Sequence, residues 1–308
     1  MNNFVNDLFN CKNITDNSRK LYIRNLTKLN ENKEIKNLTF LKNNKKILDK
    51  IKDYKPNTQR AFIISVVSLL NCAKTKDNKY NDLYITYFEI LEDMNKNLRD
   101  ATKKTDKEVD NMISQDEVNK IYNEYKFIYD EIKNSKKLSN SDYINLLKYV
   151  VLSLYILHPP RRNLDYQNML IVKEYNNEMN NKYNYFDMKT NEFIFNNYKT
   201  AKTYKSQIVK INNELVDILK TYLKFHINRK NIGKDNVYLL VDENGENFKN
   251  VNSMTRFLYK IFGKKIGVSM LRKIFLTDKY KEVVDNLKKD SNLMSNSIDT
   301  ILNNYIKQ

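Results

Sequence analysis

The fold is decided by residues 183–211, which read YNYFDMKTNEFIFNNYKTAKTYKSQIVKI. Polar residues in this stretch alternate with aromatic or aliphatic ones, and a period of two is typical of a β-strand with one buried face. A Lys-Thr-Asn turn and the basic loop Tyr198–Lys205 interrupt the alternation. The pattern therefore predicts three short strands, at Tyr183–Met188, Glu192–Asn197 and Ser206–Ile211.

The chain on both sides of these strands has a helical pattern. Ser114 and Glu117 form a capping-box pair, which predicts that a helix begins there. Ser141 offers a cap for a core helix, Tyr143–Leu157, which ends before two prolines. The expected fold class is mainly α with a small antiparallel β-sheet. Apolar periodicity predicts the remaining helices at Ser18–Leu29, Thr58–Ala73, Leu83–Leu98, Asn213–Arg229, Asn252–Phe262, Ser269–Tyr280 and Ser297–Ile306, and a last strand at Val237–Val241.

A change of composition divides the chain into two parts. Residues 95–110, NKNLRDATKKTDKEVD, are charged and almost free of large apolar side chains, which is typical of an interdomain linker. We expect a helical domain at 1–100, a linker at 101–111 and a second domain at 112–308. Both parts are basic, as expected of two lobes that grip one duplex.

The composition excludes several classes of protein. Only 4 glycines and 3 prolines argue against a Gly-rich nucleotide-binding fold and against a Pro-rich linker protein. No apolar run reaches the roughly 20 residues of a membrane helix, and the N-terminal MNNFVNDLFN lacks the pattern of a secretory signal. Cys11 and Cys72 predict neither a disulfide framework nor a zinc site, so we expect an intracellular, reducing location. The two histidines, His158 and His226, are too few for catalysis by several imidazoles. His158 is expected to pack at a helix end, and His226 is expected to lie on the surface of a helix.

The charge balance is strongly basic. Lysine and arginine number 54 against 37 aspartates and glutamates, a formal charge of +17. Such an excess favours a polyanionic partner, nucleic acid first and an anionic membrane surface second. No helix combines a basic face with a strong apolar one, so nucleic acid is the preferred partner and a membrane is not expected. Only nine of the cations are arginines, so the adjacent pair Arg161 and Arg162 points to guanidinium chemistry.

The second part of the chain carries four candidate residues in a distinctive order: Arg162, Lys199, Arg272 and Tyr305. Asp165 follows Arg162 by three residues, just after a predicted helix end. Tyr305 follows Asn296 by nine residues, within a segment that begins Met-Ser-Asn-Ser. In this order and spacing, residues 112–308 resemble the tyrosine recombinases (the phage-integrase family), particularly forms from large DNA viruses and their mobile elements. The helical first part matches the family's core-binding domain in outline.

The resemblance implies a role for each of these residues. Arg162 and Arg272 are expected to bind the non-bridging oxygens of one DNA phosphate, because guanidinium groups make bidentate bonds and keep their charge. Lys199, with Lys202 as the alternative, is expected to protonate the leaving 5′ oxygen. Tyr305 is the expected nucleophile, and its phenol needs cationic neighbours or a base to ionise. The implied product is a covalent 3′-phosphotyrosyl intermediate with a free 5′-OH, formed without a metal or other cofactor.

Three positions depart from the family's pattern. Ser269, Lys273 and Asn296 stand where the family commonly has histidine or another ring donor. Asn296 can still donate a hydrogen bond to a phosphate, and Lys273 can supply charge to DNA. Ser269 cannot replace an imidazole as a proton acceptor at neutral pH. The group that accepts the Tyr305 proton therefore stays unassigned at this point.

The basic candidates also have simpler interpretations. Arg161 and Arg162 can be surface cations after a helix stop, and Arg161 is the alternative phosphate ligand if the register differs by one, or a contact to the DNA backbone. Lys202 and Lys205 share the loop of Lys199, where they are expected to contact DNA or to be plain surface charge.

The remaining candidates have packing roles as their alternatives. Arg272 lies in an apolar helical pattern, from which a long cation can extend to solvent. Tyr305 is one of 22 tyrosines, most of which are expected to pack in a core or at its rim. Asp165 is expected to be structural and to orient Arg162.

The sequence thus predicts a site-specific DNA recombinase or integrase that cuts and rejoins strands and self-associates on DNA as a dimer or tetramer. If the protein is viral, the expected location is a viral factory in the host cytoplasm or the nucleus. Two alternatives stay open. A type IB topoisomerase uses similar groups and the same linkage, and a non-catalytic relative keeps the fold and the DNA binding but not the turnover.

Overall fold

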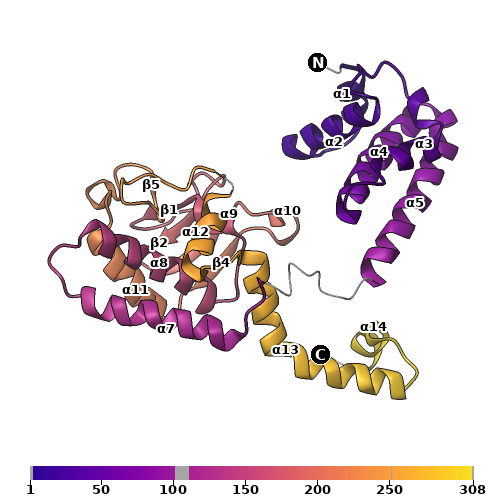
Figure 1. Cartoon of the computed structure of the whole chain (residues 1–308). Helices are drawn as coiled ribbons and strands as arrows, with labels where there is room; N and C mark the ends of the chain where they lie inside the picture. The colour runs from indigo at the N-terminus through magenta and orange to yellow at the C-terminus, as the bar shows by residue number, and fades with distance from the viewer. Residues whose placement is uncertain (1–2, 101–110, 251, 307–308) are drawn as a thin grey trace. The chain divides into compact units, whose positions relative to one another are not determined.

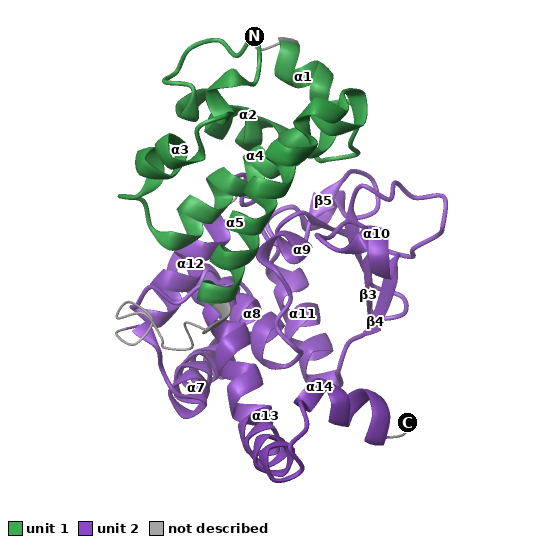
Figure 2. Cartoon of the chain, turned by 90° about the vertical axis from the view of Figure 1, so that its right-hand side faces the viewer, with its two compact units in different colours: residues 1–104 green, residues 105–308 purple. Residues whose placement is uncertain are grey.

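The computed structural model describes residues 3–100, 111–250 and 252–306. The chain divides into two compact units, residues 1–104 and 105–308 (Figures 1 and 2). The predicted linker, 101–111, lies outside the described residues except for Asn111. The side-chain oxygen of Asn111 accepts a hydrogen bond of 3.1 Å from the backbone N–H of Lys265, so this residue packs with the second unit.

The first unit is entirely helical in its described part. Its longest helix is α4, which begins with Pro56 in the first turn, where a missing N–H costs no hydrogen bond. The predicted helices at 18–29, 58–73 and 83–98 correspond to α2, α4 and α5. The elements are α1 (Asn3–Phe9), α2 (Asp16–Leu29), the 3-10 turn η1 (Thr39–Leu41), α3 (Asn44–Ile51), α4 (Pro56–Lys76), the 3-10 turn η2 (Asn78–Tyr80) and α5 (Asn81–Asp100).

The core of the first unit forms around α4, whose buried residues come from most of its faces. Tyr87 of α5 is completely buried, and its hydroxyl donates a hydrogen bond of 2.9 Å to the carbonyl of Leu41. Asn25 of α2 donates to Ser65 of α4 over 3.0 Å inside the same core. The first bond joins α5 to η1 and the second joins α2 to α4, so the buried phenol and the buried amide both have a hydrogen-bond partner.

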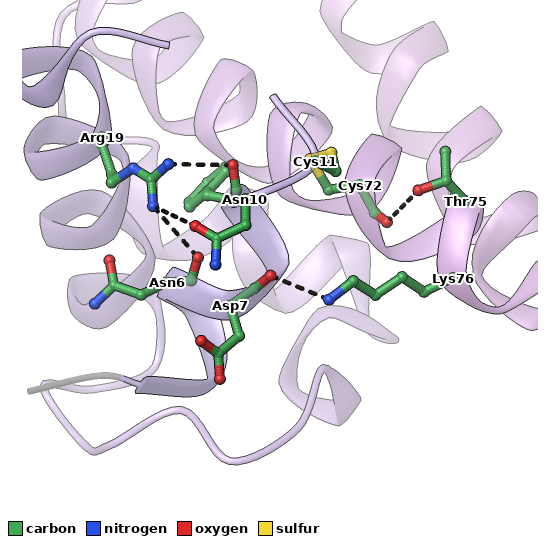
Figure 3. The surroundings of a disulfide bond; sticks show 9 residues. Asn6, Asp7, Asn10, Cys11, Arg19, Cys72, Thr75 and Lys76 are labelled. Atoms are coloured by element: carbon green, nitrogen blue, oxygen red, sulfur yellow. Dashed lines mark hydrogen bonds between the residues drawn. A yellow bond between two sulfur atoms is a disulfide. The ribbon is translucent and has the colours of Figure 1, made fainter. Parts of the chain in front are cut away.

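The expectation of no disulfide is wrong for this structure. Cys11, in the turn after α1, is bonded to Cys72 of α4 (Figure 3). The two cysteines are separated by 61 residues, and their Cα atoms lie 5.7 Å apart. Two cysteines that far apart along a chain form no recognisable pattern, because only the packing of α1 on α4 brings them together.

The second unit combines helices with one small sheet (Figure 1). Its elements are α7 (Gln115–Ile132), α8 (Asn140–Ile156), α9 (Asn163–Gln167), β1 (Met169–Val172), β2 (Asn184–Asp187), β3 (Glu192–Phe195), α10 (Ala201–Tyr204), β4 (Gln207–Lys210), α11 (Asn213–Phe225), the 3-10 turn η3 (Arg229–Asn231), β5 (Val237–Tyr238), α12 (Ser253–Phe262), α13 (Val268–Leu293), α14 (Ile298–Thr300) and the π-helical turn η4 (Ile301–Tyr305).

The sheet is mixed, whereas an antiparallel sheet was expected. Its five strands follow the order β4-β3-β2-β1-β5, and β1 pairs with β2 in parallel. The sequence pattern did not predict β1, which is only four residues long and follows α9 directly. The connection between β1 and β2 packs Tyr175 and Met179 on one face of the sheet, against Leu170 and Tyr185. Because the chain returns across that face, β2 starts at the same end of the sheet as β1.

The other face of the sheet joins the main core of this unit. Aromatic residues of β2 and β3, such as Phe186 and Phe193, pack there with residues of α8, α11 and α12. Helix α8 is buried on most of its surface, as predicted for 143–157, but its cap is Ser139 with Asp142 and not Ser141. The Ser114–Glu117 capping box of α7 is confirmed. Across residues 3–100, 111–250 and 252–306, no helix has the length and apolar character needed to cross a bilayer.

Candidate functional site

Arg161 and Arg162 lie where the chain leaves Pro159-Pro160 and enters α9. Arg162 is the residue before the first turn of α9 and has extended backbone angles, φ −72° and ψ 152°. Its carbonyl accepts a hydrogen bond of 3.0 Å from the N–H of Asp165. Consecutive side chains on an extended backbone point in opposite directions, so the two arginines have different surroundings.

The Arg161 side chain is engaged in a structural contact. Its Nε donates a hydrogen bond of 3.1 Å to Oδ2 of Asp165, and its Nη1 donates one of 3.0 Å to Oε1 of Gln207 on β4. The guanidinium carbon lies 3.7 Å from the ring centre of Phe195 and 5.1 Å from that of Tyr198. Arg161 therefore connects α9 to β3, β4 and the basic loop.

Asp165 pairs with Arg161, whereas the sequence led us to expect that it orients Arg162. Its side chain is only 4% exposed. Burial raises the pKa of this carboxyl above its usual range, and the charge and hydrogen bond of Arg161 and the charge of Arg162 oppose that shift without cancelling it. Arg162 is half-buried and makes no side-chain hydrogen bond or ion pair within the described residues. Its guanidinium group is thus available for an anionic ligand.

The starts of α9 and α13, which position Arg162 and Arg272, both lie beside Thr255 of α12. Asn163, the first residue of α9, donates a hydrogen bond of 2.9 Å from Nδ2 to Oγ1 of Thr255, while its Oδ1 accepts one of 2.9 Å from the hydroxyl of Tyr155. A Cβ on Gly267, the residue before α13, would lie 3.4 Å from Cγ2 of the same Thr255. We call the starts of α9 and α13 with Thr255 between them the arginine corner.

The arginine corner is electropositive for two independent reasons. Helix α13 is 26 residues long, and the N–H groups of its first turn carry a partial positive charge. Ser269 lies exposed in that first turn and Arg272 lies half-buried three residues later, so the two are neighbours on one face. Arg162 adds a second full charge from α9. Lys273, beside Arg272, is exposed.

A polar face of α12 borders the corner, and no sequence motif predicted it. Arg256 is exposed and Tyr259 is half-buried. The only signal in the sequence was that Arg256 is one of nine arginines and lies at helical spacing from Asn252 and Tyr259. No motif distinguishes such a face from an ordinary solvated one. A surface hollow of about 660 Å³ is lined by Asn250, Asn252, Thr255, Arg256 and Tyr259.

The basic loop between β3 and β4 is held in place through Tyr198. The Tyr198 hydroxyl donates a hydrogen bond of 2.6 Å to the carbonyl of Lys205, which closes the loop across the single turn of α10. Lys199, Lys202 and Lys205 are all exposed. Because Tyr198 also contacts the Arg161 guanidinium group, the loop lies beside the start of α9. The geometry does not distinguish Lys199 from Lys202 as a proton donor.

Tyr305 lies apart from the arginine corner. It ends η4, is 60% exposed, and its hydroxyl makes no hydrogen bond among the described residues. The carbonyl of Asn296 accepts a hydrogen bond from the Ser291 hydroxyl, and Ser297 caps α14. Figure 1 shows α13 running outward from the sheet, with α14 and the C-terminal end of the chain beyond it and away from α9. The structure therefore brings the elements of Arg162, Arg272 and the basic loop together, but not that of Tyr305.

Neither histidine contributes to the corner. His158 accepts a hydrogen bond of 3.3 Å from the N–H of Asn212, and burial lowers its pKa. His226 was expected at the surface, and this prediction is wrong: the side chain is buried against Tyr222, and its Nε2 lies 3.1 Å from the carbonyl of Tyr238. In the part of the chain that the structure describes, no three His, Cys, Asp or Glu side chains gather as a metal site would require.

The likeness of this chain to known proteins is distant. Neither a protein-family model nor a curated protein matches this sequence. Among solved structures, the chain is similar to the crystal structure of XerA recombinase, with 16% sequence identity and a TM-score of 0.36. The overlap covers 96% of this chain and 89% of that one.

Proposed function

We propose that this chain is a site-specific DNA recombinase of the tyrosine type, acting on double-stranded DNA. The observation that carries the proposal is the meeting of α9 and α13 at Thr255, because it joins two arginine-bearing helix starts beside a basic loop. Such an arrangement suits a phosphodiester, because its two non-bridging oxygens share a negative charge that two guanidinium groups can bind. An enzyme of this kind acts where its DNA lies inside the host cell, in a viral factory or the nucleus if the element is viral.

The arginine corner is proposed to stabilise the transition state of strand cleavage. Arg162 and Arg272 hold the non-bridging oxygens of the reacting phosphate, and the N-terminus of α13 adds its dipole. Charge on these oxygens grows as phosphorus passes through its five-coordinate transition state, so donors already in place lower the barrier. Removal of one such donor typically costs about 3 kcal/mol, or roughly a hundredfold in rate.

The covalent step is proposed to use Tyr305 as nucleophile. Its Oη forms a bond to phosphorus while the bond from phosphorus to the 5′ oxygen breaks, and the phenolic proton passes to solvent. Lys199 or Lys202 gives a proton to the departing 5′ oxygen. The phosphodiester is exchanged for a phosphotyrosyl ester, so a 5′-OH from another strand can reverse the step without an external energy source.

Delivery of Tyr305 is proposed to come from a second copy of the chain on the same DNA. Beyond the corner, α13 exposes four apolar side chains at helical spacing: Leu276, Tyr280, Val283 and Val284. Monomeric proteins rarely leave such a stripe uncovered. Burying it against a second protomer would fix the outer part of α13 and carry Tyr305 to the partner's arginines, which fits the predicted dimer or tetramer.

A second candidate function is DNA binding without cleavage. It is favoured by the position of Tyr305, which is exposed and away from the arginine corner. The substitutions Ser269, Lys273 and Asn296 at the family's ring-donor positions point the same way. In this alternative the arginines and the basic loop bind a duplex, and no phosphotyrosyl ester forms.

Covalent capture on a nicked suicide substrate, followed by denaturing electrophoresis, distinguishes the two. The wild type is expected to form an adduct that survives denaturation, and Tyr305→Phe is expected to form none while binding DNA as tightly. Tyr54→Phe is the matched control, because it removes another exposed phenol that lies in the first unit and outside the elements of the proposed site. Arg162→Ala and Arg272→Ala should each lower adduct formation by about a hundredfold.

Two results would contradict parts of this proposal. An adduct that persists in Tyr305→Phe would show that another residue is the nucleophile. The second candidate would be established if the protein binds the terminal DNA sequences of its mobile element in a salt-sensitive manner while neither the wild type nor any variant forms an adduct.

A further inference from the structure

The disulfide in the first unit joins two cysteines of very different accessibility. Cys72 lies in α4 and is completely buried, whereas Cys11 lies exposed in the turn between α1 and α2 (Figure 3). An attacking thiolate can therefore approach the bond only from the side of Cys11. Attack on the Cys11 sulfur makes Cys72 the leaving group, which fixes the direction of any exchange reaction.

The disulfide attaches an element that has little stability of its own. Helix α1 has seven residues, fewer than an isolated helix requires in water. It is held in the unit by the burial of Val5, Leu8 and Phe9, by Phe4, which packs against the same core, and by the covalent bond just after its last turn. Its attachment thus depends on one apolar contact and on one link that a reductant can break.

Two cations supplement this attachment at the C-terminal end of α1. Lys76, one helical turn after Cys72 on α4, donates a hydrogen bond of 3.0 Å from Nζ to the carbonyl of Asp7. Arg19 of α2 donates to the carbonyls of Asn6 and Phe9 over 3.4 and 3.3 Å (Figure 3). These carbonyls belong to the last turn of α1, where helical partners run out, and the Phe9 carbonyl also accepts a hydrogen bond of 3.1 Å from the N–H of Lys12. The bonds are at the rim of the unit and compete with water.

We propose that Cys11–Cys72 is a thiol-exchange site, and that its reduction by a dithiol releases α1 from α4. One thiolate of the dithiol attacks the Cys11 sulfur, the sulfur–sulfur bond breaks, and the Cys72 sulfur leaves as a thiolate that takes up a proton. The second thiol of the reductant then displaces Cys11, which also leaves as a thiol. The dithiol is oxidised to a disulfide, and two electrons and two protons convert the cystine into two cysteines.

Release of α1 changes the surface of the first unit. The part of α4 and its neighbours that Val5 and Phe9 cover becomes accessible, and the buried Cys72 thiol becomes reactive. The inference is independent of the proposed DNA chemistry, because it concerns residues 3–76 alone and is tested without DNA.

Hydrogen exchange followed by mass spectrometry on the full chain tests this inference. In the oxidised protein, the amides of α1 are expected to be protected. After treatment with dithiothreitol under native conditions, their exchange should accelerate by about tenfold or more, because the disulfide no longer holds α1 on α4 and α1 can open locally. Peptides from α11, in the cysteine-free second unit, serve as the internal control and should not change.

A variant separates the redox effect from unfolding. Cys11→Ser leaves Cys72 in its buried site and should exchange rapidly at α1 with or without dithiothreitol, while α4 stays protected. In the reduced wild type, iodoacetamide should modify Cys11 first and Cys72 only at the rate at which α1 opens. The proposal is overturned if the intact mass shows the gain of two hydrogens but α1 exchange is unchanged. It is equally overturned if the bond resists dithiothreitol until the protein is denatured.

Discussion

Replacing Arg161 by alanine is expected to destabilise residues 105–308, whereas the same change at the adjacent Arg162 should leave the fold intact. Arg161 holds the buried Asp165 carboxylate at 3.1 Å, and the two side chains are 21% and 4% exposed. Loss of one partner from a buried ion pair costs about 3–5 kcal/mol, because the remaining charge has no compensation. Since Arg161 keeps a fifth of its side chain in contact with solvent, we expect the low end, about 3 kcal/mol.

The contact with aromatic rings adds to this loss. The guanidinium carbon of Arg161 also lies 3.7 Å from the centre of the Phe195 ring. This cation–π contact contributes roughly a further 0.5–1 kcal/mol to stability. For a unit of this size, about 3 kcal/mol corresponds to a fall in Tm of roughly 6–12 °C. Arg162→Ala removes a half-buried side chain without bonds to other described residues, so its effect on stability should stay within about 0.5 kcal/mol.

Thermal and urea unfolding of the full chain measure both variants. The double variant Arg161→Ala/Asp165→Asn serves as a check on the cause, because it removes the unpaired charge as well. It should recover about 1–2 kcal/mol relative to Arg161→Ala alone. Equal losses for the two single variants, or no recovery in the double variant, would refute the reasoning that Arg161 is structural and Arg162 available.

Two further predictions concern stability alone. Burial lowers the pKa of His226 from 6.5 to about 4, outweighing its backbone hydrogen bond at Tyr238. The unfolded chain therefore binds one more proton between these pH values, so the free energy of unfolding should fall by up to about 3 kcal/mol as the pH drops through this window. Urea unfolding at several pH values should show this slope, and His226→Gln should flatten it; an unchanged slope would contradict the assignment. Ser114→Ala should cost about 1 kcal/mol by removing the cap of α7, whereas Glu117→Gln, which can still accept from Ser114, should cost less in the same assay.

Much of the local structure was predictable from the sequence. The capping box at Ser114 and the alternation in β2 and β3 were read correctly because each depends on residues a few positions apart. The order of Arg162, Lys199 and Arg272 along the chain identified elements that the structure brings together at the arginine corner. Their roles in chemistry, and that of Tyr305, stay predictions.

Other features had no local signal. Strand β1 has only four residues, and its parallel pairing depends on a connection that crosses the sheet. The bond between Cys11 and Cys72 depends on the docking of α1 on α4. The polar face of α12 becomes part of the candidate site only because the starts of α9 and α13 pack beside Thr255.

The sequence by itself determined that the chain is basic, mostly helical and interrupted by a short β segment, because charge, periodicity and caps are properties of neighbouring residues. Only the tertiary structure decided which of two adjacent arginines is structural, which cysteines pair, and how far Tyr305 lies from the arginine corner. Those outcomes depend on contacts between residues tens of positions apart, whose energies arise from burial and geometry that no short stretch of sequence contains.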